Sequence, residues 1–377
     1  MYTYVYMKKT ATVIIGVVLI LAAGLYVFRA EIEKLFLRPT ESSLEEGITE
    51  TSSSREVTII AENLSVPWEV VLLDEEDYLI TERPGTLKRI GSNGQVFEIE
   101  GVEETSEGGL LGLALHPDFS ENNYIYLYAT TRKNGELKNQ ISRYSYADDQ
   151  LSEPTRILDD IPASAIHDGG RIAFGPDGLL YATTGDAGLP ELAQDTASLA
   201  GKILRMTDQG EIPNDNPFDN YTYSYGHRNP QGLAWDDEER LWSSEHGPSG
   251  AESGNDEINL IEKGANYGWP VIRGQETSPD MKTPIAESGT EETWAPAGLA
   301  YSQGSLFFTG LRGQTLYEAV IDGENLSLKA HLKEEYGRLR AVVADDDFLL
   351  VTTSNTDGRG DPRTGDDKVL KFPRGIF

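Results

Sequence analysis

Beyond residue 56, the apolar positions of the chain fall in short runs that are typical of β-strands and show no helical spacing. In the clearest stretch, the apolar run 172–174 is followed by the turn 175–178 and by strand-forming residues at 179–184. Pro176 fixes the backbone φ of that turn, and Gly178 supplies a positive φ. This stretch therefore predicts a β-hairpin.

The same unit, an apolar strand, a short turn and a second strand, recurs along the chain. Its copies lie at 68–85, 110–131, 172–184, 232–245, 298–310 and 339–353. Further strand candidates follow most of them, at 86–90, 140–145, 202–206, 314–318 and 368–372. The copies are separated by roughly 40–65 residues, which is the size of a four-stranded blade with insertions.

This repeat predicts an all-β fold, a six-bladed β-propeller, in which the strand 57–61 completes the last blade and closes the ring. A β-sandwich is less consistent with so regular a repeat. In a propeller, the inter-strand loops of one face surround a central funnel. Residues at equivalent positions of the copies are therefore expected to converge there.

Residues 1–29 precede the repeat and contain an apolar run from 11 to 28, with Lys8 and Lys9 before it. They predict an N-terminal transmembrane anchor with the remainder of the chain outside the cell membrane, and a cleaved signal segment is the alternative. Residues 30–55 are acidic and rich in Ser and Thr, so we expect a flexible tether. The propeller would then be an extracytoplasmic catalytic domain at 56–377, either tethered to the membrane or secreted.

The formal net charge is −30, from 62 acidic and 32 basic residues. This charge excludes nucleic acid as a partner, because its phosphates would be repelled. The chain contains no cysteine, so disulfides do not support the fold and the apolar core must hold it together.

Two loops at equivalent positions of the third and fourth copies carry candidate chemistry. His167 and Asp168 directly precede the strand at 172–174, and a His backed by a carboxylate can act as a general base. The alternative is a His that only caps a turn. Arg228 and Asn229 precede the next copy, where Arg228 suits a carboxylate or a developing oxyanion, or else pairs with a surface acid.

Three more cations, Arg312, Arg338 and Arg340, come from the fifth and sixth copies. Basic residues that gather in the funnel of a protein with net charge −30 indicate an anionic ligand, either a polycarboxylate or a phosphate. The segments 245–250 and 255–259 flank a glycine-rich loop, and 266–270 follows them. Oxygen-rich and glycine-rich loops with clustered acids are suited to calcium. Zinc is disfavoured, because there is no cysteine and no close pair among the five histidines.

Long motifs then point to a family. The chain resembles the PQQ-dependent glucose/sorbosone dehydrogenases, specifically the aldose sugar dehydrogenases, from about 56 to 372. The resemblance is carried by the segments 108–119, 175–178, 199–205, 215–218, 225–232, 245–248 and 256–259. It implies a six-bladed propeller that oxidises the C1 hydroxyl of aldoses to lactones with pyrroloquinoline quinone (PQQ), which carries three carboxylates, and with calcium.

The resemblance also implies roles for the candidate catalytic residues. His167 would be the general base that takes the proton of the sugar hydroxyl, and Asp168 would hold it or balance its charge. Arg228 would stabilise negative charge that develops at the quinone oxygens.

Further residues match the cofactor and metal sites of the family. Cofactor contacts are implied for Asn229, Thr293, Arg338 and Arg340, and calcium ligands for the carbonyls of Gly247 and Pro248. Glu257 and the carbonyl of Tyr267 match a structural calcium site.

Two positions depart from the pattern of some family members. Glu107 stands where those members have a Gln that contacts the cofactor and the base. Arg312 stands where others have Lys. A carboxylate next to a carboxylate-rich cofactor weakens binding unless it is protonated or paired.

The sequence thus favours a quinoprotein oxidoreductase that acts on aldose sugars and passes electrons to an external acceptor such as a quinone, a cytochrome or a dye. A calcium-dependent, lactonase-like propeller hydrolase is the alternative enzyme. A sugar-binding propeller without chemistry is the alternative of another class.

Overall fold

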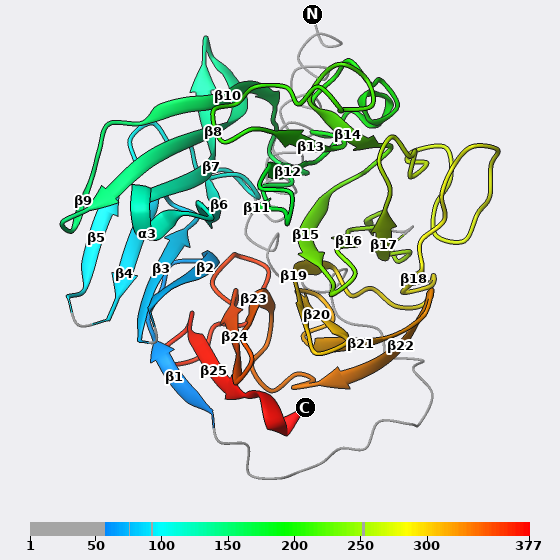
Figure 1. Ribbon diagram of the computed structural model, residues 1–377. Helices are drawn as coiled ribbons and strands as arrows, with labels where there is room; N and C mark the ends of the chain where they lie inside the picture. The colour runs from blue at the N-terminus through cyan, green and yellow to red at the C-terminus, as the bar shows by residue number, and fades with distance from the viewer. Residues whose placement is uncertain (1–56, 75, 92, 251–252) are drawn as a thin grey trace, which may run out of the picture.

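Six antiparallel sheets surround a central axis in the computed structural model of the chain (Figure 1). The structure describes residues 57–74, 76–91, 93–250 and 253–377. The predicted six-bladed β-propeller is confirmed. The anchor predicted for 1–29 and the tether predicted for 30–55 lie outside the described residues. Within the described ranges, no helix is both long enough and apolar enough to cross a membrane.

The first three blades follow the chain in order. Blade 1 contains β2 (Pro67–Asp74), β3 (Asp77–Glu82), β4 (Thr86–Ile90) and β5 (Gln95–Glu98). Blade 2 contains β6 (Leu110–Leu115), β7 (Tyr124–Lys133), β8 (Glu136–Ala147) and β10 (Thr155–Pro162), with the short β9 (Gln150–Leu151) paired to β8 and the one-turn α3 (Phe119–Asn122) between β6 and β7. Blade 3 contains β11 (Ile172–Phe174), β12 (Leu180–Thr184), β13 (Lys202–Met206) and β14 (Thr222–Tyr225), with the 3₁₀ turn η1 (Pro190–Ala193) after β12.

The other three blades complete the ring. Blade 4 contains β15 (Pro230–Trp235), β16 (Leu241–Glu245), β17 (Glu257–Ile261) and β18 (Ala286–Glu287). Blade 5 contains β19 (Pro296–Ser302), β20 (Ser305–Gly310), β21 (Leu316–Asp322) and β22 (Asn325–His331). Blade 6 contains β23 (Leu339–Ala344), β24 (Phe348–Thr353) and β25 (Val369–Pro373), followed by η3 (Arg374–Ile376), and its outer strand is β1 (Thr58–Ala61).

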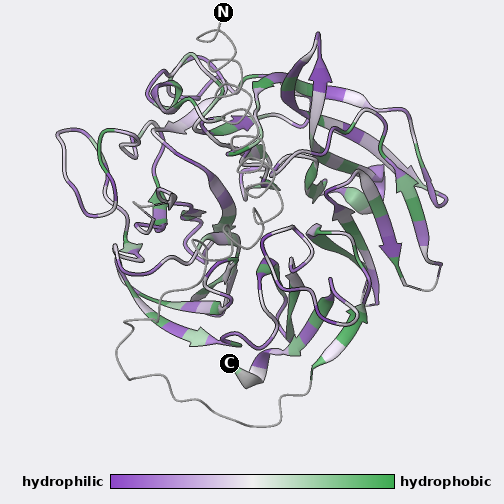
Figure 2. Cartoon of the chain, turned by 180° about the vertical axis from the view of Figure 1, so that it is seen from behind, coloured by the Kyte–Doolittle hydropathy of each residue, from purple (hydrophilic) through white to green (hydrophobic). Residues whose placement is uncertain are grey.

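The strand pairs predicted from the apolar runs are present in all six blades, because each sheet buries both faces against its neighbours. Every residue of β12 and β16 is buried, which explains why these strands read as nearly continuous apolar or small-residue runs. Large side chains such as Trp68, Trp242 and Trp294 are fully buried between blades. Apolar and polar residues form bands along the strands when the propeller is seen from behind (Figure 2).

The segments 245–250 and 255–259 were expected to flank a glycine-rich loop. In the structure β16 ends at Glu245, and Glu257–Ile261 forms β17, the third strand of blade 4, which was not predicted as a strand. Several polar residues precede and enter this strand, so its pattern is weaker than that of the inner strands.

The ring is closed by pairing the first described strand with the last. β1 runs antiparallel to β25, with Thr58 opposite Lys371 and Ala61 opposite Val369. Ile60 and Ala61 pack against the apolar cluster that blade 6 shares with blade 1. The prediction that 57–61 completes the last blade is therefore confirmed.

We expect a chain that begins at Glu56 to melt at the same temperature as the full chain. A chain that begins at Glu62 should melt lower, on the order of 5–10 °C, because it loses the ladder hydrogen bonds of β1 and the burial of Ile60 and Ala61. Thermal unfolding followed by circular dichroism measures both. Equal melting temperatures would show that β1 contributes nothing to closure.

Candidate functional site

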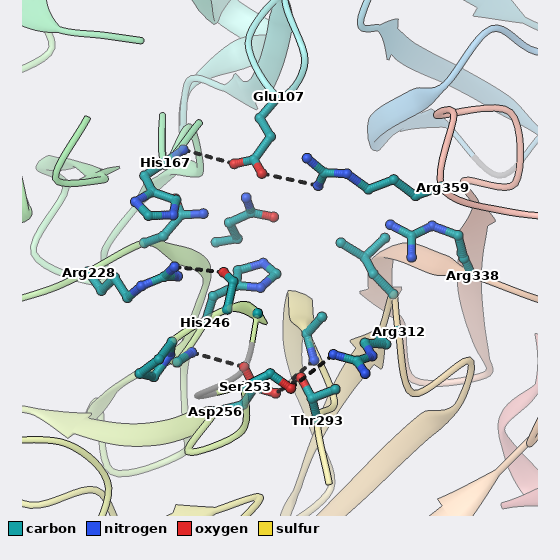
Figure 3. A pocket seen from close by; sticks show the side chains of 18 of the residues that line it. Glu107, His167, Arg228, His246, Ser253, Asp256, Thr293, Arg312, Arg338 and Arg359 are labelled. Carbon is teal, nitrogen blue, oxygen red and sulfur yellow. Dashed lines mark hydrogen bonds and ion pairs between the residues drawn. The ribbon is translucent and has the colours of Figure 1, made fainter. Parts of the chain in front are cut away.

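The loops at one end of the inner strands enclose an open cavity of about 110 Å³ (Figure 3). Its lining includes eight residues predicted from the sequence to be catalytic or cofactor-binding: Glu107, His167, Arg228, Asn229, Thr293, Arg312, Arg338 and Arg340. These residues come from five blades, so the structure brings together positions up to 233 residues apart (340 − 107). The expected convergence on a central funnel is confirmed.

His167 is held firmly at the edge of this cavity. Its Nδ1 lies 2.6 Å from Oδ1 of Asp186, which is the second residue after the end of β12. Since Nδ1 is engaged by a carboxylate, the imidazole can accept a proton at Nε2. Its backbone has a φ of +60°, a left-handed conformation that a non-glycine residue adopts only where its surroundings enforce it.

Asp186 is an ionised partner. Burial opposes its ionisation, but hydrogen bonds from His167, from the backbone of Gly188 and from the indole of Trp269 hold its pKa below the usual value. The indole Nε1 of Trp269 donates to Oδ2 of Asp186 at 2.8 Å. Trp269 thus orients the carboxylate that orients His167.

Asp168, which was predicted to hold His167 or to balance its charge, has no hydrogen bond to the imidazole among those described, whereas Asp186 has one. Oδ1 of Asp168 instead accepts a hydrogen bond from Nδ2 of Asn139 at 3.0 Å. Burial raises the pKa of Asp168 to about 7. The prediction of this contact was wrong because consecutive side chains point in different directions, whereas the residue after a neighbouring strand can reach the same point.

The carboxylate of Glu107, which would weaken the binding of an anionic cofactor if it were unpaired, is paired in the structure. Its Oε2 accepts the backbone N–H of His167 at 2.8 Å, and its Oε1 lies 3.1 Å from Nη1 of Arg359. Burial works against the charge, but Arg359 and the N–H of His167 lower the pKa of Glu107 to about 2. The carboxylate is therefore an anion with its own counter-ion.

The arginines of the cavity divide into two groups. Arg338 donates from Nε and Nη2 to one oxygen of Asp357, at 3.0 and 2.8 Å. The hydrogen bonds described for the guanidinium groups of Arg228 and Arg340 go to neutral groups instead. Nη2 of Arg228 donates to Ser249 at 2.8 Å, and Nη1 of Arg340 lies 3.3 Å from the amide oxygen of Gln231.

Burial of these two cations is unfavourable without an anion. Burial lowers the pKa of Arg228 below its usual value and lowers that of Arg340 to about 9. A buried charge costs free energy unless it is paired, so the cavity is suited to a ligand that brings negative charge. Arg312 donates to the hydroxyl of Ser253 at 3.0 Å from the opposite wall (Figure 3).

Asn229 and Thr293 are both fixed by the protein. The side-chain oxygen of Asn229 accepts the backbone N–H of Gly169 at 3.0 Å, which ties the Arg228 loop to the His167 loop. The hydroxyl of Thr293 donates to Oδ2 of Asp256 at 2.7 Å. Asp256 also accepts the N–H of Gly247 at 2.9 Å, so one carboxylate anchors two sides of the cavity.

A smaller cavity of about 10 Å³ adjoins the first, and the residues predicted to bind calcium line it: Gly247, Pro248, Glu257 and Tyr267. Burial and the nearby Glu245 raise the pKa of Glu257 to about 8. Glu257 faces Glu287 across the β17–β18 pair, and Oε2 of Glu287 is buried without a hydrogen-bond partner among the described residues.

This donor set fits a hard cation that takes oxygen ligands. Among the described residues, no three His, Cys, Asp or Glu side chains form a metal cluster. A calcium ion here would therefore take part of its ligands from backbone carbonyls, as expected from the sequence.

Sequence reasoning missed four residues of the site: Asp186, His246, Trp269 and Arg359. His246 is a half-buried histidine of the main cavity, and desolvation lowers its pKa to about 3, so it is neutral. Asp186 could have been found as the acid at the end of the third copy's second strand. Arg359 lies in a long loop outside the repeat and carried no such signal.

The funnel of this propeller contains a histidine bonded to a carboxylate and several buried arginines. These are features of an enzyme that binds an anionic cofactor or substrate. The model of the glucose/sorbosone dehydrogenase family matches residues 64–361, and the chain belongs to this family.

The relatives include enzymes and a ligand-bound structure. The aldose sugar dehydrogenase of Escherichia coli is 32% identical, over 80% of this chain and 91% of that protein. Quinoprotein glucose dehydrogenase B of Acinetobacter calcoaceticus is 39% identical over 57% of this chain, and the match spans 52% of that relative's length. The PQQ-bound aldose sugar dehydrogenase of Streptomyces coelicolor is 42% identical, with a TM-score of 0.78 over 84% of this chain and 97% of that one.

The contributions of Asp168 and Asp186 to stability should depend on pH in opposite ways. The pKa of Asp168 is raised from 3.8 to about 7, so its contribution to stability is present below pH 3.8 and is lost as the pH rises through 7. Asp168→Asn should therefore raise the melting temperature at pH 8, by roughly 2–4 °C, and leave it unchanged at pH 4.

Asp186→Asn is the matched variant. The pKa of Asp186 is lowered, so its contribution is present above 3.8 and is lost only as the pH falls through its depressed value. This variant should lower the melting temperature at pH 8. Thermal melts from pH 4 to 8 test both, and the same sign for both variants at pH 8 would contradict the assignment.

Proposed function

We propose that the protein is a quinoprotein that oxidises the C1 hydroxyl of aldose sugars to the lactone, with PQQ as cofactor. The observation that carries this proposal is the pair of buried arginines, Arg228 and Arg340, whose guanidinium groups have hydrogen bonds described only to neutral groups and line the same cavity as His167. Family membership and the PQQ-bound relative support the choice of cofactor.

The cavity suits a tricarboxylate. Arg228 and Arg340 would exchange their neutral hydrogen-bond partners for carboxylate or quinone oxygens, which removes the cost of burying them. Arg312 lies on the opposite wall, and Arg338 is already oriented by Asp357. Asn229 and Thr293 offer polar groups that the backbone of His167's loop and Asp256 hold in place.

His167 then acts as the base. A sugar whose C1 hydroxyl lies at Nε2 loses its proton to His167, and Asp186 stabilises the imidazolium that results. PQQ supplies, when bound, the two-electron acceptor for the hydride that leaves C1. Arg228 provides fixed positive charge for the negative charge that this transfer creates.

The resemblance also implies calcium, both at the cofactor and at a structural site. Gly247 and Pro248 line both cavities, so their carbonyls would be the groups that hold an ion at the cofactor site. Glu257 and the carbonyl of Tyr267 would hold a second, structural ion. Calcium increases the electrophilicity of a quinone that it contacts.

The remaining assignments rest on the sequence. We propose that the propeller works on the extracytoplasmic side, where residues 1–29 either anchor it or direct its export, and that an external acceptor takes the electrons.

The hydrolase alternative needs several acidic ligands around a central ion. The described residues contain no such cluster.

Purified protein supplied with PQQ and calcium should reduce an artificial dye when glucose is added.

The His167→Gln variant should bind PQQ nearly as well as the parent protein, but its kcat should be lower by on the order of 10²–10⁴, since it lacks a positioned base. Arg340→Ala should mainly weaken PQQ binding, with turnover recovering at high PQQ concentration. An unaltered protein that never reduces dye, with any of several aldoses, would refute the proposed function.

Calcium removal should lower both activity and stability. An ion that binds only the folded state stabilises it by about 2.7 kcal/mol at one hundred times its Kd. Excess chelator should therefore lower the melting temperature, and Glu257→Gln should reduce that response. A melting temperature and a dye-reduction rate that both stay constant in chelator would exclude the metal.

A further inference from the structure

We propose that Arg359 is a positioning residue that acts through Glu107 on the backbone of His167. The proposal rests on the proposed function for the role of His167, but its contacts are independent of any cofactor. Arg359 lies in the loop between β24 and β25 of blade 6, and His167 lies in the loop before β11 of blade 3. Glu107 joins them across the cavity (Figure 3).

The first step of the argument is the conformation of His167. Its φ of +60° lies in the left-handed region, which side chains other than glycine rarely adopt. Two hydrogen bonds hold it there, one at each end of the residue. The N–H donates to Glu107 at 2.8 Å, and the carbonyl accepts the N–H of Ala187 at 3.2 Å.

The second step is the position of Glu107. Its loop lies between β5 and β6, and its carboxylate reaches into the cavity that the arginines line. One oxygen is used by His167. The other pairs with Nη1 of Arg359 at 3.1 Å, while Nη2 of Arg359 donates to the hydroxyl of Ser106 at 3.1 Å. Arg359 therefore binds two consecutive side chains of this loop, those of Ser106 and Glu107.

The third step is charge. Without Arg359, Glu107 would place a bare carboxylate beside the site for an anionic ligand, and repulsion would displace it from His167 or weaken the ligand. With Arg359 the pair is neutral as a unit. Asp357 strengthens the arrangement, because its two oxygens hold the side chain of Arg338 and the backbone N–H of Arg359.

A direct contact between Arg359 and the cofactor is the competing explanation, and a double variant separates the two. Arg359→Gln alone should weaken PQQ binding and lower kcat on the order of 10–10²-fold, since small displacements of a base have effects of this size. Arg359→Gln with Glu107→Gln should recover most of both losses. The amide oxygen of Gln accepts the N–H of His167 and needs no counter-ion.

A cofactor-free measurement gives the second readout. Protein labelled with ¹⁵N only at histidine gives five backbone amide signals, and the one lost in His167→Gln belongs to His167. In apo-protein, Arg359→Gln should shift this signal strongly, and the double variant should return it toward the parent position. Arg132→Gln is the matched control, because it breaks an exposed pair with Glu103 outside the cavity and should shift nothing.

Two results would overturn the proposal. One is an unchanged His167 amide signal in Arg359→Gln. The other is a double variant that binds PQQ as poorly as Arg359→Gln, which would mean that Arg359 contacts the cofactor itself. Failure of the parent protein to oxidise any sugar would refute the proposed function alone, because the amide measurement needs neither sugar nor PQQ.

Discussion

Closure of the ring is the constraint on which the rest of the structure depends. The inner strands of neighbouring blades pack against one another, except that β15 of blade 4 packs on β12, the second strand of blade 3. This packing continues all round only if the first and last blades meet, as β2 and β23 do. Pairing of β1 with β25 in blade 6 joins the two ends of the described chain. Closure buries both faces of each sheet, and it also brings loops from distant parts of the sequence to one funnel.

The electrostatics of that funnel oppose those of the whole chain. The protein carries a net charge of −30, yet its main cavity is lined by Arg228, Arg312, Arg338, Arg340 and Arg359. Arg338 and Arg359 have carboxylates of the protein beside them, so they shape the site. Arg228 and Arg340 are bonded to hydroxyl and amide groups, which release a cation more readily than a carboxylate does. The site is therefore arranged to meet an incoming anion at defined points.

The sequence predicted the fold well because inner and middle strands are buried on both sides and show as apolar runs. Outer strands were harder to find. β22 alternates between exposed and half-buried residues along most of its length, and β18 has only two residues, so neither leaves a clear pattern. The ring of candidate arginines was likewise found from its position relative to the repeat.

The contacts within the site were less predictable, because they depend on which side chains face each other. Asp168 was chosen as the partner of His167 for its adjacency in sequence, whereas Asp186 reaches the imidazole from the end of β12. Arg359 belongs to the loop between β24 and β25, and its meeting with Glu107 is a product of ring closure alone.

The surroundings of His167 explain why two neighbouring acids differ so much. The left-handed backbone at His167 turns its ring toward Asp186 and leaves Asp168 beneath, against Asn139. Asp186 receives donors from three directions and stays ionised, while Asp168 is buried with one oxygen unpaired among the described residues and has its pKa raised to about 7. When two titratable groups have environments that move their pKa values apart, the environments assign the roles. Here they make Asp186 the ionised partner of the His167 imidazole. Asp186 constrains the imidazole at Nδ1. Glu107 and the N–H of Ala187 constrain the main chain of His167, the first at its N–H and the second at its carbonyl.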